Sequence, residues 1–96
     1  MFLIKKPYAV GDVVSVKLIN GDELIGTLDE ETDVLIKLDR PKALTLQAGG
    51  LGMIPWMLLG EGDKVTFSKT HVLALMMSNK DAASQYTQGI TGIALS

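Results

Sequence analysis

The part of the chain that most constrains the fold is residues 13–38, VVSVKLINGDELIGTLDEETDVLIKL, where apolar and polar residues alternate in successive runs. Alternation at every second position is typical of strands that bury one face. Asn20-Gly21 follows the first run and favours a hairpin, because both residues tolerate the positive φ of a type I′ turn. The acidic stretch 29–33 separates the second run from the third. The sequence therefore predicts an antiparallel meander.

Gly26 lies inside the second predicted strand. A glycine in a strand gives up side-chain packing and costs backbone entropy, so it usually marks a bulge, a bend or a close backbone approach. A bend at Gly26 would allow a small sheet to curl into a barrel. The alternative interpretation is a glycine that is tolerated in a flat strand.

These features together resemble the first motif of the Sm-like proteins, which include the bacterial RNA chaperone Hfq and the LSm proteins. The resemblance rests on the alternation before Asn20-Gly21, on Gly26 followed by Leu28, and on the acidic turn. It implies an all-β fold, a small and strongly bent five-stranded antiparallel Sm-like (SH3-like) barrel that forms a ring. We assign the barrel to residues 1–78 and a C-terminal tail to residues 79–96.

The rest of the chain is less regular. Residues 43–47 either extend the third strand past Pro41 or form a short strand of their own, and further strands are expected at 56–59, 64–67 and 72–76. The segment 1–12 is expected to be extended, without the N-terminal helix that is usual in Sm-like proteins. The predicted core consists of Val14, Val16, Leu18, Leu24, Leu28, Ile36, Leu38, Val65, Phe67 and Val72.

The tail changes in composition after residue 78. Asn79 can cap a short helix that runs to about Tyr86, with Asp81 near its N-terminus. Residues 89–96 alternate weakly and are expected to form an edge strand or a loose arm. The sequence therefore predicts a tail with a short helix, an edge strand, or both.

Composition limits the function of the chain. Its 96 residues form one domain, and 47% of them are hydrophobic, so apolar surface is left over for self-association. A net charge of −2 argues against a protein that coats nucleic acid through many phosphate contacts. The longest apolar stretch, 51–59, is too short to span a bilayer, and the N-terminus lacks the order of a secretory signal. We expect a cytoplasmic protein without membrane contact.

Motifs for catalysis or metal binding are not found. The chain has one histidine, His71, and no cysteine, so it offers neither a nucleophile–base pair nor a thiolate site. The acidic stretch 29–33 lacks the spacing of a calcium loop, and the glycines of 49–52 lack the lysine of a phosphate-binding loop. We expect no enzyme, no metal and no cofactor.

The resemblance implies that single-stranded RNA, or single-stranded DNA, lies at the lumen of the ring, between the turn after the second strand and the turn before the last. The residues of this chain that fall at these turns, and that are expected to contact the nucleic acid, are Asp33, Lys37, Lys69, Thr70 and His71. If Asp33 matches the family aspartate, Lys37 stands in place of a base-reading asparagine. If Thr32 matches it instead, Ile36 stands there and Lys37 falls in the core, which is costly for a lysine. A stacking aromatic residue is missing, so contacts to phosphate with little base preference are expected.

The resemblance also implies a ring in which the fourth strand of one subunit pairs with the last strand of the next. The apolar residues expected at this interface are Trp56, Met57, Leu58, Leu59, Val72, Leu73, Ala74, Leu75 and Met76. The predicted function is a homo-oligomeric ring that binds single-stranded RNA as a chaperone or processing accessory. The alternatives are a structural or protein-binding ring that uses segment 51–59, and a monomeric SH3-like module.

Overall fold

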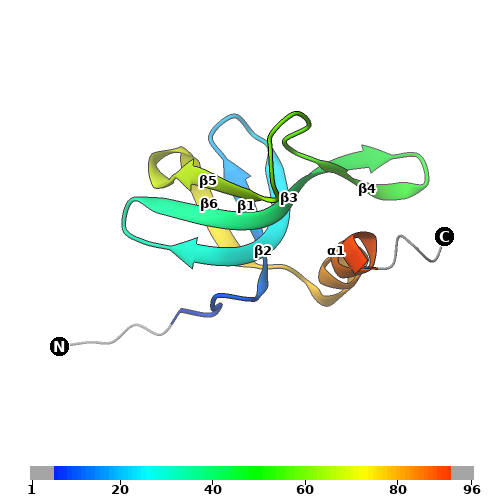
Figure 1. Cartoon of the computed structure of the whole chain (residues 1–96). Coiled ribbons are helices and arrows are strands. Elements are labelled where there is room, and N and C mark those ends of the chain that lie inside the picture. The colour runs from blue at the N-terminus through cyan, green and yellow to red at the C-terminus, as the bar shows by residue number, and fades with distance from the viewer. Residues whose placement is uncertain (1–5, 92–96) are drawn as a thin grey trace.

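A computed structural model describes residues 6–91, which form one strongly bent antiparallel sheet and one α-helix (Figure 1). The elements in chain order are β1 (Val13–Leu18), β2 (Glu23–Glu31), β3 (Leu35–Gln47), β4 (Gly50–Pro55), β5 (Lys64–Ser68), the 3-10 turn η1 (Lys69–His71), β6 (Val72–Met77) and α1 (Lys80–Thr91). Residues 1–5 and 92–96, which include part of the extended segment and of the edge strand expected from the sequence, lie outside the described residues.

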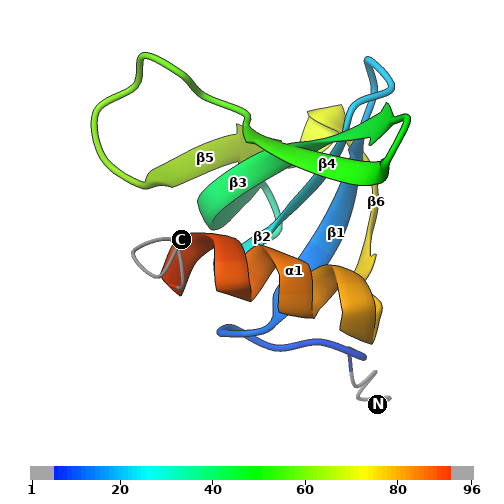
Figure 2. The ribbon, with the colours of Figure 1, turned by 90° about the vertical axis from the view of Figure 1, so that its right-hand side faces the viewer.

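The sheet has the strand order β4-β3-β2-β1-β6, and β5 also pairs with β3. The long strand β3 is shared, because its residues 35–39 pair with β5 and its residues 42–47 pair with β4 along the same side. Among the described strands, β5 and β6 do not pair with each other, so the sheet is bent but not closed. Figure 2 shows them on opposite sides of the molecule.

The predicted hairpin between β1 and β2 is confirmed, but its turn type is not. Gly21 has a φ of 94° and its N–H donates to the Leu18 carbonyl at 2.9 Å. Arg40 is the one non-glycine residue of the described chain with a positive φ, so Asn20 does not adopt the left-handed conformation that a type I′ turn requires. Instead, the Asn20 side-chain oxygen accepts a hydrogen bond from the Asp22 N–H at 2.9 Å, which closes the turn.

Gly26 marks a bend and a close backbone approach, as its place in the sequence predicts. The register between β2 and β3 shifts at this glycine, between Ile25 and Thr27. A Cβ atom on Gly26 would lie 3.3 Å from the Leu38 Cβ and 3.3 Å from the Pro41 Cα. Only a residue without a side chain lets β3 cross β2 at this distance.

The prediction of a strand at residues 56–59 is wrong, because this segment forms a loop. The third strand instead continues past Pro41, and its extension pairs with β4 (Gly50–Pro55), so the sheet has a strand that the sequence did not predict. The last of these backbone contacts is the Trp56 N–H, which donates to the Pro41 carbonyl at 3.0 Å. Of residues 56–59, only Trp56 packs against the core, whereas Met57, Leu58 and Leu59 are exposed.

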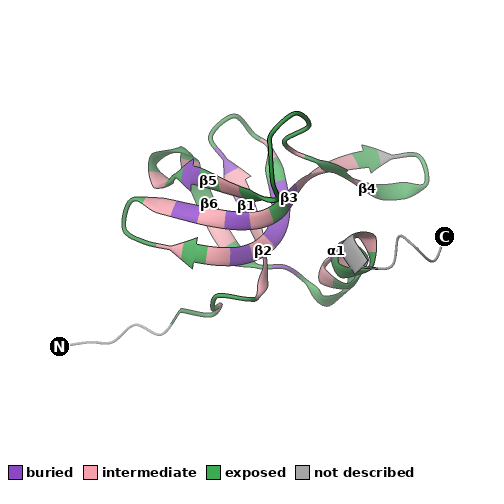
Figure 3. Cartoon of the chain, in the orientation of Figure 1, coloured by how far each residue is buried: buried purple, intermediate pink, exposed green. Residues whose placement is uncertain are grey.

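The hydrophobic core lies inside the bend (Figure 3). Its buried members are Val14, Val16, Leu18, Leu24, Leu28, Ile36, Leu38 and Phe67, and all of them were predicted. Val65 and Val72 pack against this cluster but are only partly buried. Ile25 and Tyr86 are also fully buried, although alternation from the inward-facing Leu24 puts Ile25 on the outer face of β2. The outer face of β2 is covered because α1 contacts it.

The tail forms α1 (Lys80–Thr91), which extends beyond the predicted end at Tyr86. Asn79 caps it as predicted, because its side-chain oxygen accepts the Ala82 N–H at 2.8 Å. In Figure 2 the helix lies along one end of the bent sheet. The sequence predicted that this chain lacks the N-terminal helix that is usual in Sm-like proteins. The helix that contacts the sheet in this chain is instead α1, which follows the last strand.

Candidate nucleic-acid interface

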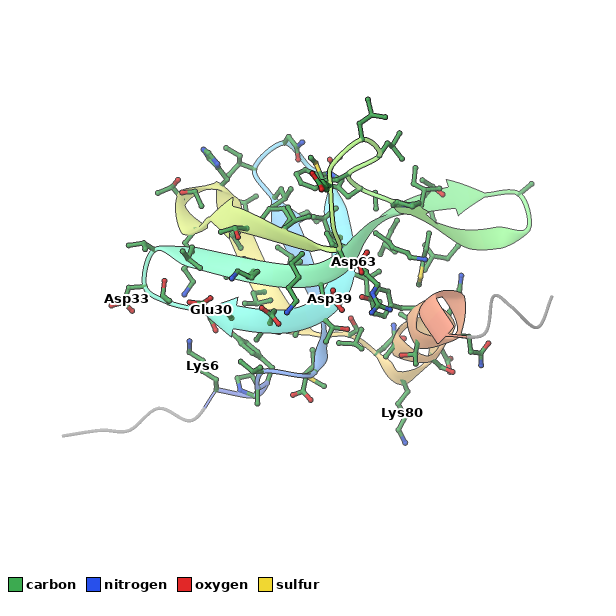
Figure 4. The ribbon with its side chains drawn as sticks, viewed as in Figure 1. Lys6, Glu30, Asp33, Asp39, Asp63 and Lys80 are labelled. Atoms are coloured by element: carbon green, nitrogen blue, oxygen red, sulfur yellow. The ribbon has the colours of Figure 1, made fainter. Side chains whose placement is uncertain are left out.

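The turn between β2 and β3 and the turn η1 lie side by side at one end of the sheet. The Lys69 N–H donates to the Val34 carbonyl at 2.9 Å, and Leu35 pairs with Ser68 just behind it. The Thr32 hydroxyl oxygen accepts the Val34 N–H at 3.2 Å, which holds the first turn in shape. Asp33 lies at the tip of this end (Figure 4). The structure therefore brings Asp33 and Lys69 onto neighbouring turns.

Glu31 is the centre of a charge cluster behind these turns. Its carboxylate lies 2.8 Å from the Lys69 Nζ and 2.9 Å from the Lys6 Nζ, and it accepts the Tyr8 hydroxyl at 3.1 Å. The Glu31 side chain is only 9% exposed. Burial raises the pKa of Glu31, but the hydrogen bonds from Lys69, Lys6 and Tyr8 together outweigh burial, so its pKa lies below the ordinary value. Lys69 is thus held by a buried carboxylate.

Sequence reasoning missed Glu31, because it assigned the whole acidic stretch to a solvated turn. Strict alternation from Leu24 would bring residue 30 to the inner face. The register shifts again between Leu28 and Glu30, and β2 continues to Glu31. The isolated sequence carries no signal for this second bulge, so only the structure reveals that Glu31 is largely buried and Glu30 is exposed.

Lys37 lies on the outer face of β3, between the buried residues Ile36 and Leu38. This placement agrees with the register in which Lys37 stays out of the core. Its Nζ lies 3.3 Å from the carboxylate of Glu30, the residue that faces it across β2. Exposed pairs of this kind contribute little to stability, about 0–1 kcal/mol, so Lys37 can exchange this partner for another anion.

The charges at this end of the sheet are balanced. Lys37 and Lys69 each lie beside a carboxylate, and at the far end of β5 Lys64 pairs with Asp29 at 3.0 Å. Asp33 makes no ion pair among the described residues and adds negative charge at the tip. A polyanion would therefore have to be bound through positioned contacts and not through net positive charge.

Of the five predicted RNA-binding residues, His71 alone lines a separate cleft of about 400 Å³. The His71 carbonyl accepts the Ile19 N–H at 3.0 Å, which ties η1 to the turn between β1 and β2. The cleft is lined by Leu18, Ile19, Asn20, Trp56, Thr66, Phe67, Ser68 and His71. Thr70, on the same turn, instead exchanges a 2.8 Å hydrogen bond with the Ser68 hydroxyl.

Trp56 lines this cleft and packs on the core. Its ring centroid lies 5.0 Å from that of Phe67, at an interplanar angle of 33°. Its Nε1–H donates to the Asp22 carboxylate at 3.2 Å, so the indole is fixed at both ends. The interpretation of Trp56 as a packing residue is favoured over a free stacking platform.

The other residues expected at the subunit interface are divided between two places. In β6, Val72 and Leu75 pack against the core, whereas Leu73 and Met76 are exposed along the free edge. Leu58 and Leu59 are exposed in the loop between β4 and β5, and Leu59 is 99% exposed. The interface prediction for residues 56–59 thus no longer rests on a strand, and the strand on that side of the sheet is β5.

Two further properties concern other classes of function. Within residues 6–91 no group of histidine, aspartate and glutamate side chains is arranged to hold a metal ion. In the same part of the chain, no helix is long and apolar enough to cross a membrane.

No protein-family model and no curated protein matches the sequence of this chain. Among solved structures, the chain is similar to the crystal structure of a heptameric archaeal Sm protein, with a TM-score of 0.52 and 18% sequence identity. The likeness covers 73% of this chain and 90% of the archaeal chain. At this identity the likeness shows the fold alone, and the fold agrees with the resemblance seen at Asn20-Gly21 and Gly26.

Proposed function

Because this chain has the Sm fold, we propose that it assembles into a homo-oligomeric ring and binds single-stranded RNA at the lumen of that ring. The observation that carries the proposal is the contact between Lys69 and Val34, which places the turn after β2 beside the turn before β6. In Sm-like rings the RNA lies between these turns. The similar archaeal Sm protein is heptameric, which supports self-association but does not fix the number of subunits here.

The open edges of the sheet support the ring. β5 pairs with β3 on one side only, and β6 pairs with β1 on one side only, so each leaves unpaired backbone groups. Leu73 and Met76 on β6 are exposed, and an apolar edge of this kind is prone to pair with another strand. Pairing of β5 in one subunit with β6 in the next satisfies both edges in a head-to-tail ring.

The lysines near the two turns are the proposed contacts to RNA. Lys37 and Lys69 would contact phosphates, with Thr70 and Asp33 as hydrogen-bond partners near the tip. A ring repeats these lysines around its axis, which concentrates positive potential even in a protein of net charge −2. Because Glu30 and Glu31 compete for the lysines, binding should be weak and should weaken further with salt. His71 lies on a separate cleft and belongs to this site only if the RNA passes over η1.

The test is a titration of labelled oligo(U) and oligo(A) at low salt, with oligo(dT) as the DNA comparison. Lys37→Glu is expected to raise the dissociation constant for the oligonucleotide at least fivefold. Lys17→Glu is the matched control, because Lys17 is also a strand lysine that faces a glutamate, Glu23, at 3.4 Å. Equal loss in both variants would point to general charge and not to a lumen site, and absence of binding to any oligonucleotide would refute the RNA proposal.

A structural or protein-binding ring is the second candidate, and a specific observation favours it. Large apolar side chains are exposed from the end of β3 to the loop before β5, namely Leu46, Leu51, Ile54, Met57, Leu58 and Leu59. Exposed apolar surface of this kind marks protein contacts. A ring that binds no oligonucleotide at low salt would support this candidate.

A further inference from the structure

Segment 43–60 carries no ionisable side chain and is the longest such stretch between the first strand and the helix. It forms the end of β3, the strand β4 and the start of the loop that leads to β5. Leu46 is 92% exposed and Leu58 is 76% exposed in this segment. Strand edges that stay open to solvent are usually protected by charged residues, and this one is not. We therefore expect another protein surface to cover this uncharged, apolar edge.

The position of the segment limits what can cover it. β4 and β5 pair with the same side of β3, one after the other, so β4, the loop 56–63 and β5 follow a single edge of the sheet. Figure 2 shows this loop above β5, at the side of the molecule opposite β6. Any strand that pairs with the open side of β5 therefore arrives beside Leu58 and Leu59.

The opposite edge of the sheet has the complementary character. β6 has the sequence VLALMM, without a charge, and Leu73 is 67% exposed while Met76 and Met77 are also exposed. The chain thus carries an uncharged apolar segment, 43–60, along one edge of the sheet and an uncharged strand, β6, at the opposite edge. Two such surfaces on one molecule would allow a head-to-tail contact between copies, which gives a ring when the rotation from one copy to the next closes.

The directions of β5 and β6 determine which end of β5 lies beside which end of β6 of the neighbouring subunit. β5 ends and β6 begins at η1, beside the turns proposed to face the lumen. In a ring, β5 of one subunit and β6 of the next are therefore antiparallel, with Lys64 and Met77 at the outer ends. The loop that precedes Lys64 then lies next to the outer half of β6, near Met76.

We propose that residues 56–60 act as a clasp, which seats Leu58 and Leu59 on the outer half of β6 of the neighbouring subunit. The proposal rests on the proposed ring and adds a second contact to it, outside the backbone pairing of β5 with β6. The occupant is a second copy of this chain, because both surfaces are uncharged and lie on the edges that ring closure brings together. The surface fits no strongly charged partner, since it offers no charge for pairing.

The first experiment measures the mass of the protein by sedimentation across a dilution series. The variant Leu58→Ser/Leu59→Ser is expected to remain folded by circular dichroism and to dissociate at a concentration at least tenfold higher than the wild type. Val10→Ser is the matched control, because Val10 is exposed and belongs to a segment that contacts the interior strand β2, where the Gly11 N–H donates to the Leu28 carbonyl at 2.8 Å. An unchanged dissociation midpoint in the double variant would overturn the clasp while leaving the ring intact.

A second experiment uses the absence of cysteine from the chain. Oxidation of Leu59→Cys/Met76→Cys is expected to link neighbouring subunits into a ladder of covalent multiples, whereas neither single variant gives a ladder. Val10→Cys/Met76→Cys is the control pair and should remain unlinked. A ring of unchanged mass that gives no ladder would count against the clasp. A wild-type mass of one chain would refute the ring and, with it, the clasp.

Discussion

The Tyr86 hydroxyl donates a 2.7 Å hydrogen bond to the Asp39 carbonyl oxygen, and so ties α1 to the bend of β3. The same hydroxyl oxygen accepts the Thr27 N–H of β2 at 3.2 Å. Tyr86 is fully buried, and burial raises the pKa of its hydroxyl above the ordinary value, which keeps the donor protonated. One side chain of the tail thus bridges both strands at the point where the sheet folds over.

Tyr86→Phe removes this bridge, so that the Thr27 N–H and the Asp39 carbonyl each lose their hydrogen bond with the Tyr86 hydroxyl. The expected loss is about 1–3 kcal/mol in the free energy of unfolding, measured by urea titration. Tyr8→Phe is the matched control, because the Tyr8 hydroxyl is only part-buried and the Glu31 carboxylate keeps its two lysine partners. If both variants lose the same stability, the Tyr86 hydroxyl has no special role.

Gly26→Ala places a Cβ against backbone and core atoms of β3 that lie 3.3 Å away. Because a strand and not a flexible side chain must move, we expect a loss of about 1–3 kcal/mol in the free energy of unfolding. Gly49→Ala provides the control, since a Cβ on Gly49 meets no atom within 4 Å and Gly49 does not have a positive φ. Equal stability of the two variants would mean that β2 and β3 do not need the close approach.

The ionisation of Glu31 makes the free energy of unfolding depend on pH in the acidic range. Its pKa is lowered in the folded state, so its stabilising contribution is fully present above the ordinary value of 4.5 and is lost as the pH falls through the folded value. Glu31→Gln should cost about 1–3 kcal/mol at pH 7 and should flatten the decline of stability in acid. The check is urea unfolding between pH 3 and pH 7, with the exposed pair variant Glu23→Gln for comparison. An unchanged acid profile in Glu31→Gln would contradict the role of the cluster.

Asn79→Ala removes the side-chain cap of α1 and is expected to lower the free energy of unfolding by about 1 kcal/mol. Asn79→Ser should restore most of this loss, because a hydroxyl oxygen can also accept the Ala82 N–H. Helix content by circular dichroism and urea unfolding provide the two readouts. A serine variant as unstable as the alanine variant would indicate that Asn79 acts through another contact.

The strands that form the core could be predicted because their signals are local. The alternation around Val14 and Val16, the Asn20-Gly21 turn and the glycine inside β2 each act within a few residues. The same applies to the cap at Asn79. The Sm-like fold follows from this part of the chain, and the likeness to the archaeal Sm protein confirms it.

The rest depends on contacts between residues that are distant in sequence. β4 forms at 50–55 and not at 56–59 because the extension of β3 offers a partner there, and nothing in the loop itself signals this. Glu31 is largely buried because of a bulge after Leu28 that the sequence does not mark. Tyr86 becomes a core residue only when α1 packs across β2. The lysine partners of the candidate site could not be predicted for the same reason.

The proposed ring with RNA at its lumen can be tested by a single sedimentation experiment. Labelled oligo(U) is sedimented at low salt with the wild-type protein, and the mass of the labelled particle is determined. The RNA is expected to sediment with a particle of several chains and to leave that particle as salt is raised. RNA that sediments alone, or with a single chain of 10.3 kDa, would refute the proposed RNA-binding ring.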